Sequence, residues 1–201
     1  MSGRARDDGR VRIIGGHWRG RKLAVASVPA LRPTPDRVRE TLFNWLGPYI
    51  PGAACLDLFA GTGALGFEAL SRGAAAATLL DADPVVVDTL AQHRETLAAE
   101  AATIIRADAR YWLATNPPKP YDVVFVDPPF GQGLVIEITE RLLAGWLAVS
   151  GMAVGSWMGK DVGNDSFYYG RRAPGRKEER ARPVQLAGSA DSPSRHDGVV
   201  L

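Results

Sequence analysis

Short apolar runs alternate with segments of helical character from residue 53 to residue 157, and this alternation restricts the fold more than any other feature. The apolar runs lie at 54–59, 76–81, 102–107, 121–126 and 151–157. The helical segments between them lie at 63–73, 84–100, 109–114 and 134–147. Near-continuous apolar strands joined by helices build parallel sheets that are covered on both faces. We therefore expect an α/β fold with a mostly parallel sheet.

The chain length and composition fit one folded domain. There are 201 residues, of which 46% are apolar and 23% charged, as in ordinary globular proteins. The sequence has no apolar run of about 18 residues, which a membrane span needs, and residues 1–16 contain no apolar signal core. Cys55 is the one cysteine, which excludes an internal disulfide and fits a reducing compartment. We expect a monomeric cytoplasmic protein without a membrane or metal requirement.

The charge is distributed unevenly along the chain. Residues 1–50 hold ten Arg and Lys against four Asp and Glu, whereas residues 51–168 hold seven against fourteen. Residues 169–201 are basic again, with seven against four. A basic arm on an acidic domain suggests a polyanionic partner that the arm contacts. A solvated basic tail is the alternative, and charge alone does not decide between them.

The N-terminal region predicts a hairpin and a helix. Residues 1–10 are expected to be disordered, and residues 11–23 alternate apolar and basic side chains around a Gly-Gly pair, which indicates a small hairpin. A helix follows at 34–46, with Thr34 as its cap and Pro35 in its first turn. Its apolar stripe consists of Val38, Leu42, Trp45 and Leu46. Arg37 and Arg39 lie off that stripe, so we expect both to be exposed.

The stretch GTGALG at 61–66 matches the glycine pattern of dinucleotide-binding loops. It follows an apolar strand and precedes a helix, which favours a nucleotide-type ligand over a purely structural turn. Asp57 stands four residues before Gly61, where a carboxylate would repel a pyrophosphate. S-adenosylmethionine instead carries a sulfonium and an ammonium, which a carboxylate attracts. Asp57 therefore favours this methyl donor, although it could also serve to cap the loop.

The ends of the next two strands offer further cofactor contacts. Asp81 lies about twenty residues past the glycines, where a carboxylate binds ribose hydroxyls. Asp83 is an alternative, or a cap for the helix that begins at Pro84. Asp108 could accept a hydrogen bond from the adenine amine, or cap a helix. The predicted cofactor set is Asp57, Phe59, Gly61, Gly63, Asp81, Asp108 and the backbone of Ala109.

The motif VFVDPPFG at 124–131 is the most specific in the chain. A Pro-Pro turn that ends a strand explains the two prolines, but not the acid and the aromatic residue beside them. Asp127 and the carbonyl of Pro128 could accept the two N–H groups of an exocyclic base amine and direct its lone pair at a methyl group. Pro129 would stiffen this loop, and Phe130 could stack on the base. A base that reaches this loop must first leave its stack.

Four motifs together resemble the RsmD family, the bacterial guanine-N2-methyltransferases of 16S ribosomal RNA. The motifs are RIIGGHWRGRKL, LRPTPDRVRETLFNWL, LDLFAGTGALGFEALSRG and VFVDPPF, and the resemblance runs from about residue 11 to residue 155. It implies a Rossmann-like S-adenosylmethionine-dependent methyltransferase that acts on the small ribosomal subunit or its assembly intermediate. In that case the basic arm contacts RNA. Its candidate residues are Arg12, Trp18, Arg19, Arg21, Lys22, Arg32, Arg37 and Arg39.

The resemblance also defines a division of the chain. We expect an RNA-binding hairpin and helix at 11–50, a catalytic domain at 51–158, and a basic tail at 159–201. The family would close its sheet with an apolar antiparallel hairpin, but the tail is rich in Gly, Arg, Ser and Pro and alternates little outside PVQLAG at 183–188. We therefore expect it to be mostly disordered. Three other functions remain open: adenine-N6 methylation, RNA binding without catalysis, and a dehydrogenase.

Overall fold

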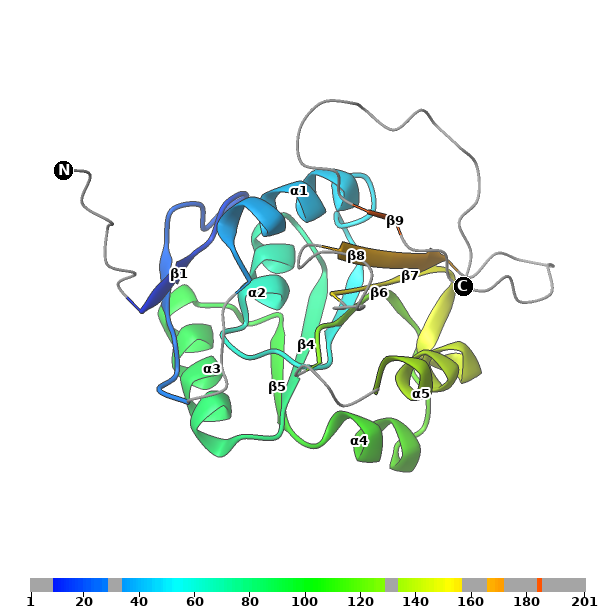
Figure 1. Ribbon diagram of the computed structural model, residues 1–201. Helices are drawn as coiled ribbons and strands as arrows, with labels where there is room; N and C mark the ends of the chain where they lie inside the picture. The colour runs from blue at the N-terminus through cyan, green and yellow to red at the C-terminus, as the bar shows by residue number, and fades with distance from the viewer. Residues whose placement is uncertain (1–8, 29–33, 129–133, 157–165, 172–183, 186–201) are drawn as a thin grey trace.

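One sheet forms the centre of the molecule (Figure 1). The computed structural model describes residues 9–28, 34–128, 134–156, 166–171 and 184–185. Within them the strand order is β5 (Ala102–Arg106), β4 (Ala76–Asp81), β3 (Ala54–Asp57), β6 (Tyr121–Val126), β7 (Leu147–Ser156), β8 (Ser166–Arg171) and β9 (Val184–Gln185). Neighbours from β5 to β7 are parallel, whereas β8 and β9 are antiparallel additions. The predicted, mostly parallel α/β sheet is therefore confirmed.

Helices cover both faces of the sheet (Figure 1). The helices α1 (Asp36–Leu46), α2 (Ala64–Ser71) and α3 (Pro84–Leu97) contribute to one hydrophobic cluster, and α4 (Ala109–Thr115), α5 (Leu134–Arg141) and η1 (Leu142–Trp146) to the other. Successive residues of β3 belong to different clusters: Cys55 is part of the first and Leu56 of the second. Side chains of a strand point alternately to opposite faces, so a strand between two helical layers must be apolar at nearly every position.

The N-terminal hairpin packs on the first of these layers. Strand β1 (Arg10–Arg12) pairs with β2 (Lys22–Ala24), and Val11 lies opposite Leu23. The Gly-Gly pair stands in the loop between the strands and lies against α2. A Cβ atom on Gly16 would collide with the backbone of Ser71, whose carbonyl accepts a hydrogen bond from His17 N at 2.7 Å. The predicted hairpin is confirmed, and its connecting loop is anchored to the helix that follows the glycine motif.

Two boundaries differ from the sequence predictions. The helix expected across 134–147 ends earlier: α5 passes into the π-helical turn η1, in which Gly145 has a φ of 133°. Strand β7 then begins at Leu147, directly after η1. A left-handed residue cannot continue a helix, so the chain leaves the helix and enters the sheet here.

The tail expected at 159–201 contains the two short strands β8 and β9. Strand β8 pairs with β7 from Phe167–Ser156 to Arg171–Met152, and this strand was not predicted from the sequence. The sequence SFYYGR is rich in aromatic residues, which favour strands. The composition of the whole tail concealed this short segment. The pairing satisfies backbone groups along β7 that an exposed edge would leave open.

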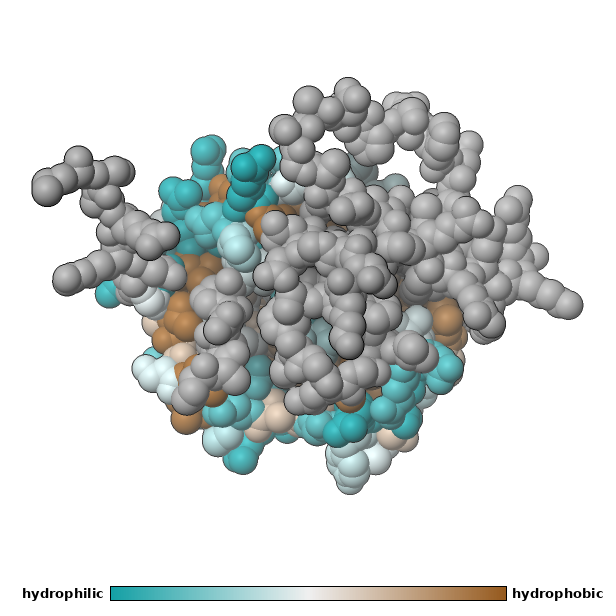
Figure 2. Space-filling view, in the orientation of Figure 1, coloured by the Kyte–Doolittle hydropathy of each residue, from teal (hydrophilic) through white to brown (hydrophobic). Residues whose placement is uncertain are grey.

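Hydrophilic residues gather on two parts of the surface in view. Figure 2 shows them at the upper left, near the start of α1, and again at the bottom over α4. Among the residues that the structure describes, no helix is long and apolar enough to span a membrane.

Candidate active site

The glycine loop between β3 and α2 takes a tight left-handed course. Gly61 has a φ of 52° and Gly63 a φ of 74°, values that glycine adopts without steric cost. A Cβ atom on Gly63 would also collide with the side chains of Phe67 and Leu90. Gly61 N donates to Asp81 Oδ2 at 3.0 Å. The loop therefore lies against the end of β4, and its backbone is close enough to the sheet edge for a ligand to contact both.

Asp57 is the last residue of β3 and is almost completely buried, with 1% of its surface exposed. Its Oδ2 accepts a hydrogen bond from Gly66 N at 3.1 Å. Its Oδ1 is buried without a hydrogen bond of good geometry among the described residues. Burial raises the pKa of Asp57 to about 7, and the charges of Asp127 and Asp81 act in the same direction, while the backbone amides of Gly66 and Phe59 oppose them. Asp57 thus holds the start of α2 through Oδ2, and its Oδ1 could face a cation.

The sequence left open whether Asp83 binds the cofactor or caps the next helix. Asp83 Oδ1 accepts from Val85 N at 2.8 Å and Val86 N at 3.4 Å, so Asp83 is the cap of α3. Asp81 ends β4, and besides Gly61 it accepts a hydrogen bond from Asp83 N at 3.0 Å. Its carboxylate is half-buried beside the glycine loop, which is compatible with the predicted ribose contact.

Asp108 is a helix cap in the structure. Its Oδ1 accepts from Tyr111 N at 3.0 Å at the start of α4, and its side chain is 51% exposed beside Arg110. Ala109, the first residue of α4, is buried. The structure therefore shows the capping role that we considered as the alternative, and the second carboxylate oxygen of Asp108 carries no part of the cap.

Asp127 and Pro128 follow β6 directly and are half-buried. Asp127 Oδ2 accepts a hydrogen bond from Thr34 Oγ1 at 3.2 Å. Thr34 was expected to cap α1, but the cap position is Pro35 and no side chain caps this helix. The hydroxyl of Thr34 is directed to the sheet edge instead. Pro129 and Phe130 lie outside the described residues.

Three carboxylates thus gather at the carboxyl edge of adjacent strands β4, β3 and β6. Asp81, Asp57 and Asp127 are close enough for the charges of the outer two to raise the pKa of Asp57. Within the described part of the chain, no three His, Cys, Asp or Glu side chains are grouped as metal ligands. An anionic edge with an unsatisfied, buried oxygen suits an organic cation better than a pyrophosphate.

The basic arm presents some of its predicted cations to solvent. The exposed members are Arg12, Arg19, Arg21, Lys22 and Arg37. Arg12 is ion-paired with Asp36 at 3.5 Å, and Arg21 Nη2 donates to Thr96 O at 3.4 Å. Trp18 is half-buried against the core, and Arg32 lies outside the described residues. The arm therefore carries a cationic surface on the hairpin and α1.

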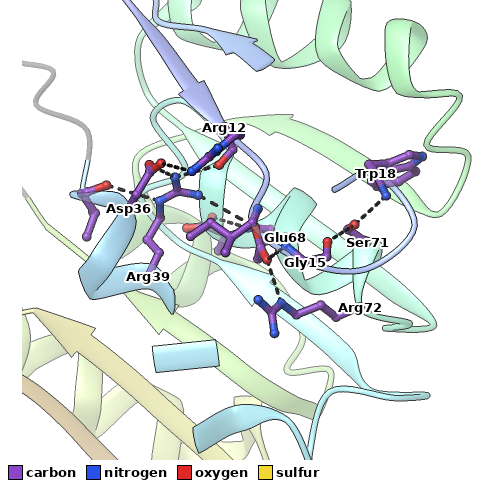
Figure 3. Close-up of polar contacts among 12 residues, drawn as sticks. Arg12, Gly15, Trp18, Asp36, Arg39, Glu68, Ser71 and Arg72 are labelled. Atoms are coloured by element: carbon purple, nitrogen blue, oxygen red, sulfur yellow. Dashed lines mark hydrogen bonds and ion pairs between the residues drawn. The ribbon is translucent and has the colours of Figure 1, made fainter. Parts of the chain in front are cut away.

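Arg39 is the exception, and its predicted place on the RNA-binding surface is wrong. Its side chain is 0% exposed. Figure 3 shows its guanidinium between Asp36 and Glu68: Nη2 donates to Asp36 Oδ1 at 2.6 Å and to Arg12 O at 2.8 Å. Nη1 lies 3.9 Å from Glu68 Oε2. A buried guanidinium between two carboxylates cannot reach a phosphate.

Glu68 is the buried partner of Arg39 that the sequence reasoning missed. Its two oxygens accept hydrogen bonds from Ile14 N, Gly15 N and Arg72 Nε, each at 2.7 Å (Figure 3). Ser71 continues the contact, since its Oγ donates to Gly15 O at 2.6 Å and accepts from Trp18 N at 2.8 Å. Every residue of α2 is buried. A glutamate within such a helix signals a buried partner, although the sequence does not identify Arg39.

Comparisons with known proteins agree with this geometry. The family model described as "Conserved hypothetical protein 95" matches residues 11–157. The Escherichia coli K12 protein named "Ribosomal RNA small subunit methyltransferase D" is 56% identical over 142 residues, which cover 70% of this chain and 71% of that protein.

Two solved structures are also similar. A putative methyltransferase, yhhF, from Escherichia coli has a TM-score of 0.67 and 47% identity, covering 74% of this chain and 81% of that one. The putative methylase HI0767 from Haemophilus influenzae has a TM-score of 0.65 and 37% identity, covering 87% and 94%. The matched region contains both the arm and the acidic strand edge. The chain therefore belongs to the RsmD family and has its Rossmann-like methyltransferase fold.

Proposed function

We propose that this protein transfers a methyl group from S-adenosylmethionine to the exocyclic N2 of a guanine in small-subunit ribosomal RNA. The observation that carries the proposal is the position of Asp127. It follows β6, the strand beside β3, and its charge helps to raise the pKa of Asp57, which ends β3 just before the glycine loop. A group bound at Asp127 therefore lies next to a ligand bound at Asp57. This is the proximity that a direct transfer between them requires.

The cofactor would lie on the carboxyl edge of β3 and β4. S-adenosylmethionine supplies an electrophilic methyl group on a sulfonium. Asp57 would face its cationic part with the unsatisfied Oδ1, and Asp81 would bind the ribose hydroxyls. Asp108 and Ala109 stand at the start of α4, where they would contact the adenine. The glycine loop would allow close approach of the backbone, without a pyrophosphate to repel the carboxylates.

The guanine amine would meet the loop after β6. Asp127 and the carbonyl of Pro128 would accept its two N–H groups, with Pro129 and Phe130 completing the base site. Asp127 is already held by a hydrogen bond from Thr34, so its orientation is set before the substrate arrives. Preorganised acceptors of this kind lose little free energy to reorientation during the reaction.

The RNA would be held by residues 11–50 while residues 51–158 carry out catalysis. Exposed cations of the hairpin and α1 would contact phosphates, which position RNA without reading its sequence. Selection of the site would then depend on the shape of the RNA and on the unstacked base. The name of the Escherichia coli relative, which is 56% identical, supports ribosomal RNA of the small subunit as the substrate class.

The test is a methylation assay with labelled cofactor and small subunits purified from cells that lack this modification. Digestion to nucleosides should place the label in N2-methylguanosine. The variant Asp127→Ala should lose at least about 100-fold in rate, in line with the loss of a preorganised polar contact. Asp88→Ala removes an exposed carboxylate on α3 and should leave the rate unchanged.

Each alternative function gives a different product. Label on adenine N6 would replace the guanine proposal with adenine methylation by the same loop. RNA binding without cofactor binding would indicate a catalytically impaired factor. Calorimetric binding of NAD, and not of S-adenosylmethionine, would favour the dehydrogenase.

A further inference from the structure

Thr34 and Asp127 are linked across the site although they stand far apart in the chain. Thr34 Oγ1 donates to Asp127 Oδ2 at 3.2 Å, over a sequence separation of 93 residues. Thr34 precedes α1 and is half-buried. Its hydroxyl makes no capping bond to that helix. A side chain of the N-terminal region therefore contacts the carboxylate that the proposed function assigns to the substrate amine.

Thr34 is itself held by a buried side chain. Its carbonyl oxygen accepts a hydrogen bond from Arg39 Nε at 3.3 Å. The guanidinium of Arg39 cannot easily reorient, because Asp36 accepts a hydrogen bond from it at 2.6 Å and Glu68 lies 3.9 Å away. Glu68 in turn stands on α2, the helix that follows the glycine loop. A continuous set of contacts therefore runs from that helix through Arg39 and Thr34 to Asp127.

We propose that Thr34 is a positioning residue for Asp127, held in place by Arg39. This inference rests on the proposed function, in which Asp127 accepts a hydrogen bond from the exocyclic amine of the target base. The hydrogen bond at Oδ2 restricts rotation of the carboxylate and fixes the direction of its other oxygen. A carboxylate that rotates freely would spend much of its time out of line with the amine.

The chemistry favours a hydroxyl at this position. Asp127 ionised can only accept hydrogen bonds, so a partner that orients it must be a donor. A threonine hydroxyl donates without adding a positive charge, which would compete with the cationic methyl donor for the carboxylates of this edge. Thr34 thus orders the site and leaves its negative charge available for the cofactor.

The test compares Thr34→Val, which removes the donor at nearly constant shape, with Thr34→Ser, which keeps it. In the full chain, Thr34→Val should lower kcat by about ten-fold or more, since small displacements of a catalytic group cost up to about 100-fold. KM for the small subunit and the Kd for cofactor should change by less than about two-fold, and Thr34→Ser should restore most of kcat. Thr89→Val is the matched control, because the Thr89 hydroxyl donates to Val85 O within α3, away from the site.

A spectroscopic measurement tests the contact without substrate. With ¹³C-carboxyl-labelled aspartate, the Asp127 resonance is identified by its loss in Asp127→Asn. It should shift in Thr34→Val and return in Thr34→Ser. An unshifted resonance, or full kcat in Thr34→Val, overturns the positioning role. Lack of activity in the unmodified protein together with a shifted resonance contradicts the proposed function and leaves the Thr34–Asp127 contact established.

Discussion

Arg39 Nη1 lies 3.9 Å from Glu68 Oε2, and neither side chain has any exposed surface. The pair joins α1 to α2, and Glu68 also accepts hydrogen bonds from the backbone amides of Ile14 and Gly15. Removal of one partner from a buried ion pair leaves a charge without compensation. The contact therefore connects the stability of the N-terminal hairpin to the helix that follows the glycine loop.

Arg39→Met should destabilise the protein by about 3 kcal/mol or more, because Glu68 would keep a buried charge and, among the described residues, only Arg72 as its cationic partner. Urea unfolding followed by circular dichroism measures the change. Arg37→Met, on the exposed side of the same helix, is the matched control and should change stability by no more than about 0.5 kcal/mol. An equal loss of unfolding free energy in the two variants would show that the buried ion pair does not contribute to stability.

Asp57→Asn should stabilise the cofactor-free protein at neutral and higher pH. The pKa of Asp57 is raised by burial from 3.8 to about 7, so the folded state holds a proton that the unfolded state has already lost. The contribution of Asp57 to stability therefore decreases as pH rises from about 4 to 7 and is constant above that range. Asparagine keeps an acceptor for Gly66 N and carries no charge.

Thermal melting from pH 4 to pH 8 measures this difference. The melting temperature of Asp57→Asn should exceed that of the unmodified protein by a margin that grows up to about pH 7. The same variant should bind S-adenosylmethionine more weakly at pH 8, since the attraction of a carboxylate for the cation is lost. A margin that shrinks with rising pH would contradict the burial of an ionisable Asp57.

His93 makes the docking of the hairpin sensitive to acid. Its Nε2 accepts a hydrogen bond from Ala24 N at 3.0 Å, and burial lowers the pKa of His93 below its usual 6.5. The unfolded state therefore binds the proton first as pH falls, and the stability that neutral His93 provides is lost below about pH 6.5. His93→Gln offers an acceptor that does not titrate. The stability difference between the two proteins should change between pH 7.5 and pH 5.5, and parallel melting curves would refute this role.

Cys55 should be unreactive in the folded protein. It is buried in β3, and burial raises the pKa of the thiol to about 12, with Asp122 and Asp57 adding to the effect. The thiolate is the reactive form, so a disulfide reagent at pH 8 should label Cys55 only after unfolding in denaturant. Rapid labelling of the native protein would place this thiol at the surface. The result also bears on the chemistry, because methylation of carbon through a covalent adduct needs an accessible cysteine.

The exposed arginines of the arm should act on RNA affinity through charge. Arg19→Gln and Arg37→Gln should each reduce the slope of log K against log salt by about one if the side chain contacts a phosphate. Lys119→Gln removes an exposed cation just before β6, outside the arm, and should leave the slope unchanged. Filter binding to ribosomal RNA fragments over a range of salt concentrations measures these slopes. An unchanged slope in both arm variants would remove them from the interface.

Much of the fold was predictable because its information is local. Apolar runs identified β3 to β6 within one or two residues, and the glycine loop indicated the turn into α2. In a parallel sheet the strand ends meet at one edge, so Asp57, Asp81 and Asp127 were expected together. The end of the helix at Gly145 and the strand β8 were missed. A left-handed residue and a short edge strand each leave only a weak local pattern.

Arg39 shows where local reasoning fails. The buried side of α1 is Arg39, Leu42, Phe43 and Leu46, which has the spacing of a helical face, but the sequence predicted a stripe that left Arg39 out. Burial of an unpaired charge would be costly. The cost is offset by Asp36 and by Glu68 from another helix. The predicted stripe was wrong at Val38 and Trp45, which are half-buried, and nothing in the sequence located the partners of Arg39.

The sequence alone therefore determined the order of strands and helices, the glycine loop and the set of acids at the strand ends, since each depends on neighbouring residues and on the geometry of parallel sheets. Only the tertiary structure decided that Glu68 holds Arg39 and that Thr34 donates to Asp127. These partners are far apart in the chain, and no periodic pattern records them. Packing brings them together, and it is tolerated because each buried charge or donor then has a hydrogen-bonding or ion-pair partner.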